Sequence, residues 1–392
     1  CIAANYNMYQ PHTGKRGHRE RHSDKGITFR HSNQQYHRRI QATIPRNANI
    51  TSQHRQTHRT FALHHQRSDR RNGRHRILRE LGPDNREGRG KRSQVLAIDT
   101  DFWRIVSIDL SNPKLAKGAL ADLSGRIVDR TELPADNGCS VDDVISLCKQ
   151  LIASTPLPIL GIGIAVTGIV EPDGVVRKSV HLEWNELPLK AEVENATGVP
   201  TLVGNDTNAA LVAERFFGDC SPNSMLISIG RGVGAALCLN DVIIEGSSST
   251  AGEIAHVVVD PNGPTCECGK RGCLESLVSD DRLQERIAQD PASRTRILAE
   301  AGALLGRVMA IPAGLLDLRD ISIYGAPEIV NAQFIDAMED EIRRTMTTDY
   351  QKAPQIHRCR QGEDLTLRGQ ATIVIRTLVP TIHERGSLIG DA

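Results

Sequence analysis

Four potential metal ligands lie close together in this chain. His256 is followed by Cys266, Cys268 and Cys273, which places three thiols within eight residues. Thiolates and imidazole are the ligands of a closed tetrahedral zinc site, and the intervening glycines let the backbone turn tightly around one ion. A disulfide is the alternative, but three cysteines cannot pair evenly, and Cys266 and Cys268 are too close for an easy bridge. The spacing therefore predicts a structural zinc site with all four residues as ligands.

The charge of the chain is unevenly distributed. Residues 1–92 contain 21 Lys+Arg and 6 Asp+Glu, whereas residues 93–392 contain 27 and 41. A strongly basic arm therefore precedes an acidic body. The arm suggests a nucleic-acid partner through phosphate contacts, and the body by itself would repel DNA.

The remaining cysteines and the apolar runs indicate the cellular compartment of the protein. Six cysteines outside the cluster are scattered without paired spacing, which favours a reducing cytoplasm. The longest apolar stretch, residues 157–170, contains a proline and three glycines and is too short to span a bilayer. With no secretory signal at the start of the chain, we expect a cytoplasmic protein without a membrane partner.

Residues 1–76 have an unusual composition. They hold ten of the fourteen histidines, together with many Arg, Gln, Asn and Thr residues. No window shows apolar residues at helical spacing over two turns. Such a segment buries too little apolar surface to offset its ordering entropy, so we expect it to be largely disordered.

From Val95 onward the pattern alternates between strands and helices. The sequence predicts strands over 95–99, 105–109, 117–122, 159–166, 225–229, 234–239 and 320–324. It predicts helices over 141–153, 205–217 and 334–346, and a long helix over 294–318 interrupted at Pro312. This alternation indicates two α/β lobes.

The segment Ala251–His256, the segment Asp260–Pro264 and the cysteine cluster together resemble the signature of the ROK family (repressors, open reading frames, sugar kinases). The resemblance extends from about Gly88 to the C-terminus. It implies a two-lobed actin-like, ribonuclease-H-like sugar-kinase fold with a sugar in the cleft. We expect one lobe over 93–204 plus 370–392, and a second over 205–369 that carries the zinc loop.

Regulators of this family carry a winged helix-turn-helix domain where this chain has its basic arm. Its hydrophobic pattern is missing from residues 1–76, which we hypothesise to be a frame-shifted or misassigned translation. Residues 77–92 resemble the remnant that links such a domain to the body. The resemblance places four basic residues near DNA: Arg86, Arg89, Lys91 and Arg92.

The resemblance also assigns a sugar site. The residues at sugar-contacting positions are Gly168, Asn205, Asp206, Glu253, His256 and Glu275. Carboxylates and an amide suit the hydroxyls of a hexose, because they offer several acceptors and donors. We expect Glu253 and His256, three residues apart, to share one face of a helical turn. Taken singly, each residue is better explained as a helix cap or a solvated charge; the combination with the zinc motif favours sugar contact.

The phosphate-binding turn of the family's kinases is altered in this chain. Those kinases have Asp-x-Gly-Gly-Thr-Lys, whereas this chain has Ser111, Asn112 and Pro113 after Asp109. Side chains replace bare backbone and Pro113 lacks a backbone donor, so ATP phosphates should be excluded. We therefore expect no catalytic residue. Asp206 would be the general base if the protein were a kinase.

The sequence thus predicts a transcriptional regulator of the repressor type that binds a sugar or sugar-phosphate effector and operator DNA. Family regulators of this kind are homo-oligomers, so a homodimer or homotetramer is expected. Two alternatives stay open: an ATP-dependent hexose or N-acetylhexosamine kinase, and a sugar-binding protein without a working DNA-binding domain.

Overall fold

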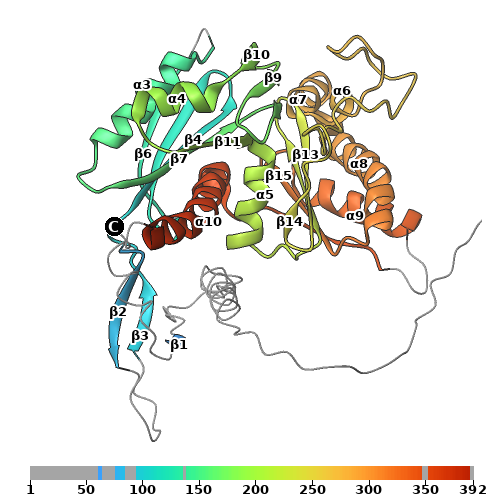
Figure 1. Cartoon of the computed structure of the whole chain (residues 1–392). Helices are drawn as coiled ribbons and strands as arrows, with labels where there is room; N and C mark the ends of the chain where they lie inside the picture. The colour runs from blue at the N-terminus through green and yellow to red at the C-terminus, as the bar shows by residue number, and fades with distance from the viewer. Residues whose placement is uncertain (1–60, 64–75, 84–93, 136–137, 347–351, 389–392) are drawn as a thin grey trace, which may run out of the picture. The chain divides into compact units, whose positions relative to one another are not determined.

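The computed structural model describes residues 61–63, 76–83, 94–135, 138–346 and 352–388. Two five-stranded sheets form the body of the chain (Figure 1). The first contains β4 (Arg104–Asn112), β5 (Leu115–Ala121), β6 (Ile127–Pro134), β7 (Ile159–Val166) and β11 (Thr201–Asn205). Beside it lies a small antiparallel sheet of β8 (Ile169–Val170), β9 (Val176–Ser179) and β10 (Trp184–Leu187).

The helices that pack with the first sheet include α3 (Val141–Ala153) and α4 (Leu189–Thr197). Helix α3 begins at Ser140, whose hydroxyl accepts a hydrogen bond from the Asp143 amide while the Asp143 carboxylate accepts one from the Ser140 amide. This reciprocal cap satisfies amides that the first turn leaves without partners. The face of α3 that meets the sheet is apolar, with Leu147 and Leu151 fully buried.

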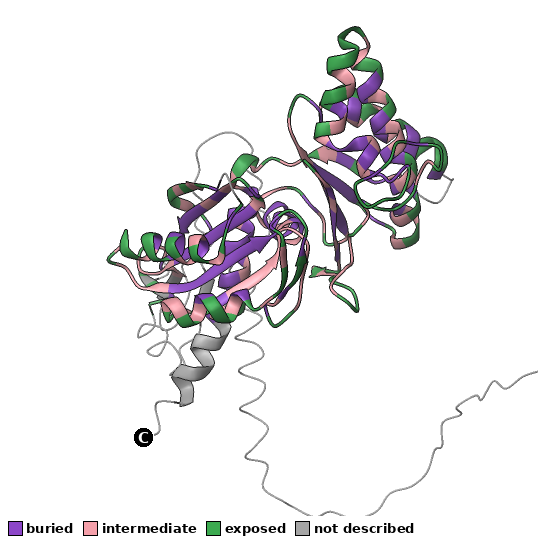
Figure 2. Cartoon of the chain, turned by 90° about the horizontal axis from the view of Figure 1, so that it is seen from above, coloured by how far each residue is buried: buried purple, intermediate pink, exposed green. Residues whose placement is uncertain are grey.

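The second sheet contains β12 (Ser224–Ile229), β13 (Val233–Leu239), β14 (Val242–Ile243), β15 (Asp320–Gly325) and β16 (Gln355–Arg358). The helices that follow β11 along the chain are α5 (Asp206–Phe217), α6 (Glu275–Val278), α7 (Asp280–Gln289), α8 (Arg294–Leu316), α9 (Ala332–Met346) and α10 (Leu365–Leu388). Buried residues run along the strands of both sheets and the helix faces that cover them (Figure 2).

The two sheets share one topology. The first has the order β11-β7-β4-β5-β6 and the second β14-β13-β12-β15-β16. In each, three consecutive strands form an antiparallel meander, and the two later strands add in parallel beside its first strand. This repeated arrangement is the ribonuclease-H-like unit, so the predicted two-lobed α/β fold is confirmed.

Helix α10 lies against the first sheet, and the sequence pattern did not reveal it as a helix. Its Leu367 carbonyl accepts a hydrogen bond of 2.6 Å from the Ser107 hydroxyl on β4. The two glycines of β7 make room for it, since a Cβ at Gly163 would lie 3.0 Å from Val374 and one at Gly161 only 2.5 Å from Leu378. The Gly-rich strand is therefore a packing surface for a helix.

The prediction that Pro312 interrupts the long helix was wrong. Helix α8 runs continuously from Arg294 to Leu316 with Pro312 inside it. The proline falls in the last turns, where Met309 and Ala313 on either side are buried in the core and hold the helix in place. Residues 291–316 are also long and apolar enough to cross a membrane, but half of the 18-residue apolar window within them is buried in the protein.

Strands also form ahead of the body. Strand β3 (Gln94–Ile98) pairs antiparallel with both β1 (Phe61–Leu63) and β2 (Leu78–Pro83). The β2–β3 hairpin contacts the body where the Arg79 guanidinium bonds Asp101 at 3.0 Å and Arg76 stacks 4.1 Å from the Phe102 ring centre. Most of residues 1–76, and residues 84–93 with all four basic residues expected near DNA, lie outside the described residues.

Candidate functional site

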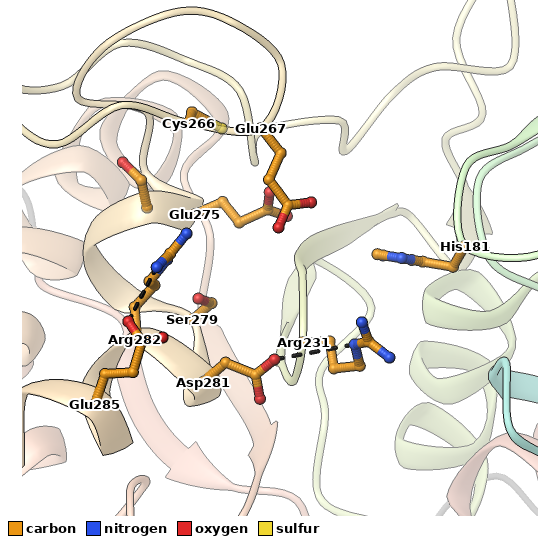
Figure 3. A pocket seen from close by; sticks show the side chains of 10 residues that line it. His181, Arg231, Cys266, Glu267, Glu275, Ser279, Asp281, Arg282 and Glu285 are labelled. Carbon is orange, nitrogen blue, oxygen red and sulfur yellow. Dashed lines mark hydrogen bonds and ion pairs between the residues drawn. The ribbon is translucent and has the colours of Figure 1, made fainter. Parts of the chain in front are cut away.

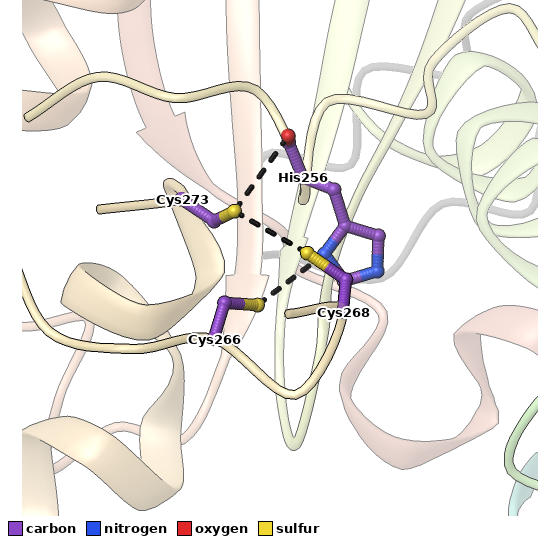
Figure 4. A group of neighbouring side chains, drawn as sticks. All are labelled: His256, Cys266, Cys268 and Cys273. Carbon is purple, nitrogen blue, oxygen red and sulfur yellow. Dashed lines mark hydrogen bonds between the residues drawn. The ribbon is translucent and has the colours of Figure 1, made fainter. Parts of the chain in front are cut away.

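The structure brings the four predicted metal ligands together. The donor atoms of His256, Cys266, Cys268 and Cys273 all lie within 4.8 Å of one another (Figure 4). Cys266 Sγ is 3.6 Å from His256 Nδ1, and Cys268 Sγ is 3.6 Å from Cys273 Sγ. The second distance is far longer than the S–S bond of about 2.05 Å, so these thiols are not bridged.

These separations fit a zinc ion. Zinc–sulfur bonds of about 2.3 Å and zinc–nitrogen bonds of about 2.0 Å give tetrahedral edges of roughly 3.5 Å. The observed pairs at 3.6 Å match such edges. The Lys270 backbone amide lowers the pKa of the Cys268 thiol, which favours the thiolate that binds metal. With four protein donors the site leaves no position for a catalytic water.

Glycines determine the path of this loop. Gly269 and Gly272 adopt φ angles of 85° and 66°, which disfavour residues with a Cβ. Gly272 also lies against the preceding segment, because a Cβ there would be 1.5 Å from the Asp260 carbonyl oxygen. Its own carbonyl accepts from the Val259 amide at 2.9 Å, which ties the two arms of the loop together.

The predicted sugar residues divide into two groups, and the first surrounds the start of α5. Asn205 caps the helix, accepting a hydrogen bond from the Asn208 amide at 3.0 Å. Its side-chain amide donates to the Gly168 carbonyl at 3.0 Å. Gly168 has φ 98°, and a Cβ there would lie 2.3 Å from the Lys178 carbonyl oxygen. Gly168 and Asn205 are therefore in direct contact.

Next to this cap lies a pair of carboxylates, Asp109 and Asp206. Burial raises the pKa of Asp206 to about 7, the charge of Asp109 adds to the rise, and hydrogen bonds from Thr207 and Ser111 oppose it. Burial likewise raises the pKa of Asp109. Two neighbouring carboxylates in a dry site do not ionise together easily, so this pair holds a proton more readily than ordinary aspartates.

Ser111, in the altered phosphate turn, is engaged by this pair. Its backbone amide donates to Asp109 Oδ1 at 2.9 Å, and its hydroxyl donates to the same oxygen. Pro113 is buried at the tip of the β4–β5 hairpin, where the Lys114 amide donates to the Asn112 side chain. In a glycine turn, the backbone amides would donate to phosphate oxygens. Here the amides of Ser111 and Lys114 donate instead to the side chains of Asp109 and Asn112.

The second group contains Glu253, His256 and Glu275. Burial raises the pKa of Glu253, with the Glu275 charge adding to the rise and His256 opposing it. His256 Nδ1 lies 3.8 Å from Glu275 Oε1. The expectation of a helical turn here was wrong, because residues 251–256 form a series of tight turns. Gly252 forces them, since a Cβ there would lie 1.9 Å from the Ala235 carbonyl oxygen.

Strand β13 connects the two groups. A Cβ at Gly234 would lie 2.7 Å from the hydroxyl of Thr207, the residue after Asp206. The adjacent Ala235 amide donates to the Gly252 carbonyl at 3.1 Å, immediately before Glu253. The Glu275 amide in turn donates to Ala255 at 2.9 Å, next to His256. Continuous packing therefore links the predicted sugar residues across β13.

A pocket of about 140 Å³ borders the zinc-type cluster (Figure 3). Of the six predicted sugar residues, Glu275 lines it, while Asn205, Asp206 and Glu253 do not. Its lining also includes His181 from the small sheet's β9–β10 connection, Arg231 from the β12–β13 turn and Arg282 from α7. Sequence reasoning missed His181 and Arg282 as site residues, because neither belongs to a motif that could be recognised in the sequence.

The chain is similar to sugar kinases and to regulators. The model of the ROK family matches residues 105–376. Identity to the glucokinase of Halalkalibacterium halodurans is 36% over 191 residues, covering 46% of this chain and 57% of that protein. Identity to the DNA-binding transcriptional repressor Mlc of Escherichia coli is 27% over 350 residues, covering 80% and 84%.

Among solved structures, the chain resembles a ROK family transcriptional regulator described as a homolog of E. coli Mlc. The TM-score is 0.71 at 23% identity, with 82% of this chain and 90% of that chain covered. This likeness shows the fold. The chain spans little more than half the length of the glucokinase, and its relatives include both kinases and repressors.

Proposed function

Because the chain belongs to the ROK family, we propose that it is a sugar-responsive transcriptional regulator rather than a sugar kinase. The observation that carries this proposal is the engagement of Ser111. Both its amide and its hydroxyl donate to Asp109 Oδ1. A phosphate oxygen would have to displace these bonds and also pass the side chains of Asn112 and Pro113, which lowers the affinity for ATP.

The effector is a sugar or sugar phosphate. Gly168, Asn205 and Asp206 present a carbonyl, an amide and a carboxylate beside one another, which suits neighbouring ring hydroxyls. Glu253, His256 and Glu275 supply the second set of acceptors. The zinc ion, held by His256 and the three cysteines, is structural: it fixes the loop that carries these acceptors.

The β2–β3 hairpin supports a DNA partner. Its two strands are joined by a segment that contains Arg86, Arg89, Lys91 and Arg92. Arg76 and Arg79 tie the hairpin to the body through Phe102 and Asp101. A conformational change in the body on effector binding would thus move the basic hairpin and change its affinity for operator DNA. The regulator would act as a cytoplasmic homodimer or homotetramer.

A kinase is the second candidate, and the Asp109–Asp206 pair favours it. A carboxyl group with a pKa of about 7 is suited to accept a proton from a sugar hydroxyl near neutral pH. A third candidate is a sugar sensor without a working DNA-binding domain, since residues 1–76 lack the hydrophobic pattern of a winged helix-turn-helix.

Calorimetric titration separates the first two candidates. We expect one sugar among glucose, N-acetylglucosamine and glucose 6-phosphate to bind, and Mg-ATP to give no heat with or without that sugar. Asp206→Asn should weaken sugar binding by about 1–3 kcal/mol, because a charged hydrogen bond is lost. Tight Mg-ATP binding, or sugar-dependent ATP turnover that Asp206→Asn abolishes, would instead establish a kinase.

Gel-shift assays test the DNA partner. With DNA from the region upstream of its own gene, we expect binding that weakens as salt rises and that changes when the sugar is added. Arg89→Ala with Lys91→Ala should reduce the affinity, whereas Lys149→Ala, an exposed change on α3, should leave it unchanged. Equal behaviour of these variants would argue for the sugar sensor.

A further inference from the structure

A second group of metal-type donors lies within the second lobe. A thiol from Cys220, a carboxylate oxygen from Asp320 and a ring nitrogen from His357 all lie within 4.8 Å of one another. Cys220 and Asp320 are buried and His357 is half-buried. None of these residues belongs to the cluster formed by His256 and the three cysteines.

The sheet brings these donors together through strand register. Asp320 and Ser322 are two residues apart on β15, so their side chains share one face of the sheet. Ser322 pairs with His357 on the neighbouring parallel strand β16. Cys220 approaches from the connection between α5 and β12, with its Sγ 2.7 Å from Ser322 Oγ, which is itself 2.9 Å from His357 Nε2. All four positions are therefore fixed by regular structure or by a short connection to it.

Two buried carboxylate oxygens beside this group have no hydrogen-bond partner within the described part of the chain, Asp320 Oδ1 and Glu214 Oε1. The opposite oxygen of Asp320 accepts from the Ser221 amide at 2.9 Å, and that of Glu214 accepts from the Arg360 amide at 3.3 Å. Leaving a buried acceptor unsatisfied costs about 1–3 kcal/mol. A cation beside Asp320 would remove part of this cost.

We propose that Cys220, Asp320 and His357 bind a second zinc ion, with the Ser322 hydroxyl as the remaining donor. Thiolate, imidazole and carboxylate are the three ligand types that zinc takes in proteins. One thiolate and one carboxylate neutralise the two positive charges of the ion, so the complex can be buried without a net charge. Cys220, Asp320 and His357, whose donor atoms already lie within 4.8 Å of one another, reach the tetrahedral edge of roughly 3.5 Å by small shifts. Ser322 Oγ, 2.7 Å from Cys220 Sγ and 2.9 Å from His357 Nε2, would move slightly away from both as the ion enters.

Most of this group of donors is buried, and only His357 is partly exposed. Ser322 is fully buried and Cys220 is 1% exposed, whereas His357 lies on β16 at the edge of the sheet. A buried thiol and hydroxyl offer no room for a substrate, so a catalytic Cys–His pair is a poor account of the arrangement. The ion would join β15, β16 and the segment after α5, and its role is to stabilise that corner of the sheet.

Zinc content of the full chain tests the proposal. After purification with zinc and removal of loosely bound metal, we expect about two ions per wild-type chain and about one in His357→Gln or Cys220→Ser. Cys148→Ser, which removes a buried thiol from α3, should keep about two and controls for the loss of a core cysteine. Combining Cys268→Ser with His357→Gln should leave almost none.

Cobalt substitution provides an independent readout. In a Cys268→Ser background, Co²⁺ should give a thiolate charge-transfer band that disappears on adding Cys220→Ser. The proposal is overturned if wild type holds a single zinc ion that Cys268→Ser removes, if His357→Gln leaves the content unchanged, or if no cobalt band forms. These outcomes do not depend on sugar or DNA binding.

Discussion

At the scale of single residues, Gly272 shows how closely the zinc loop depends on one missing Cβ. Gly272→Ala would place a methyl group 1.5 Å from the Asp260 carbonyl oxygen. We expect the unfolding free energy to fall by about 3 kcal/mol or more, with loss of bound zinc. Gly269→Ala is the matched control: it has a similar φ, but open space around its Cβ, and should cost only about 1 kcal/mol. Urea unfolding and zinc content measure both, and equal losses would contradict the steric explanation.

Asp206 gives a prediction about pH. Its pKa of about 7 lies above the ordinary aspartate value of 3.8, so the folded state holds the proton more tightly than the unfolded state. Below about pH 4 the carboxyl group is protonated in both states and does not lower the free energy of unfolding. This free energy then falls as the pH rises from about 4 to about 7. Asp206→Asn removes this fall. We expect it to stabilise the protein at pH 8 by about 1–3 kcal/mol, with little gain at pH 4.

Thermal unfolding at the two pH values measures this difference. Asp336→Asn, at an exposed position on α9, serves as the control and should change the melting temperature little at either pH. If Asp206→Asn stabilised equally at both pH values, the cause would be packing or helix capping and not the proton.

At the scale of elements, helices α8 and α9 approach each other through glycines. A Cβ at Gly302 would lie 2.1 Å from the Phe334 carbonyl oxygen, and one at Gly306 would lie 2.6 Å from that of Met338. Gly302→Ala should therefore destabilise the lobe by about 2–3 kcal/mol, although alanine is the better helix former. Ala303→Gly on the same turn should cost only about 1 kcal/mol. Urea denaturation distinguishes them, and stabilisation by Gly302→Ala would show that the helices move apart freely.

Elements with strong local signals were predicted well from the sequence. The bounds expected for α3 and β7 match the structure, because a capping box and a continuous apolar run define them locally. Helix α10 was not recognised, because most of its residues from Leu365 to Val379 are buried against β4, β7 and α5, which hides the helical period of an amphipathic face. The engagement of Ser111 by Asp109 and Asp206 could not be predicted either, since it depends on α5 meeting β4, far away in sequence.

At the scale of the whole molecule, α10 and α5 join the parts of the body. A Cβ at Gly369 would lie 1.8 Å from the carbonyl oxygen of Ala209, on the helix that begins with Asp206. We expect Gly369→Ala to lower the melting temperature by several degrees and to weaken sugar binding, because α5 must shift. Thr377→Ala, exposed on α10, should do neither. Unchanged sugar affinity in Gly369→Ala would show that a displacement at the α10–α5 contact does not move the residues at the start of α5.

The contact between α10 and α5 also restricts how the body can change shape. With the backbones in contact at Gly369, a sliding displacement of one helix along the other would drive α-carbons into carbonyl groups. Sliding of the helices past each other therefore has the higher free-energy cost at this crossing, and rotation about the contact point has the lower one. A response to an effector would accordingly be a hinge movement, with an axis that a single glycine keeps in place.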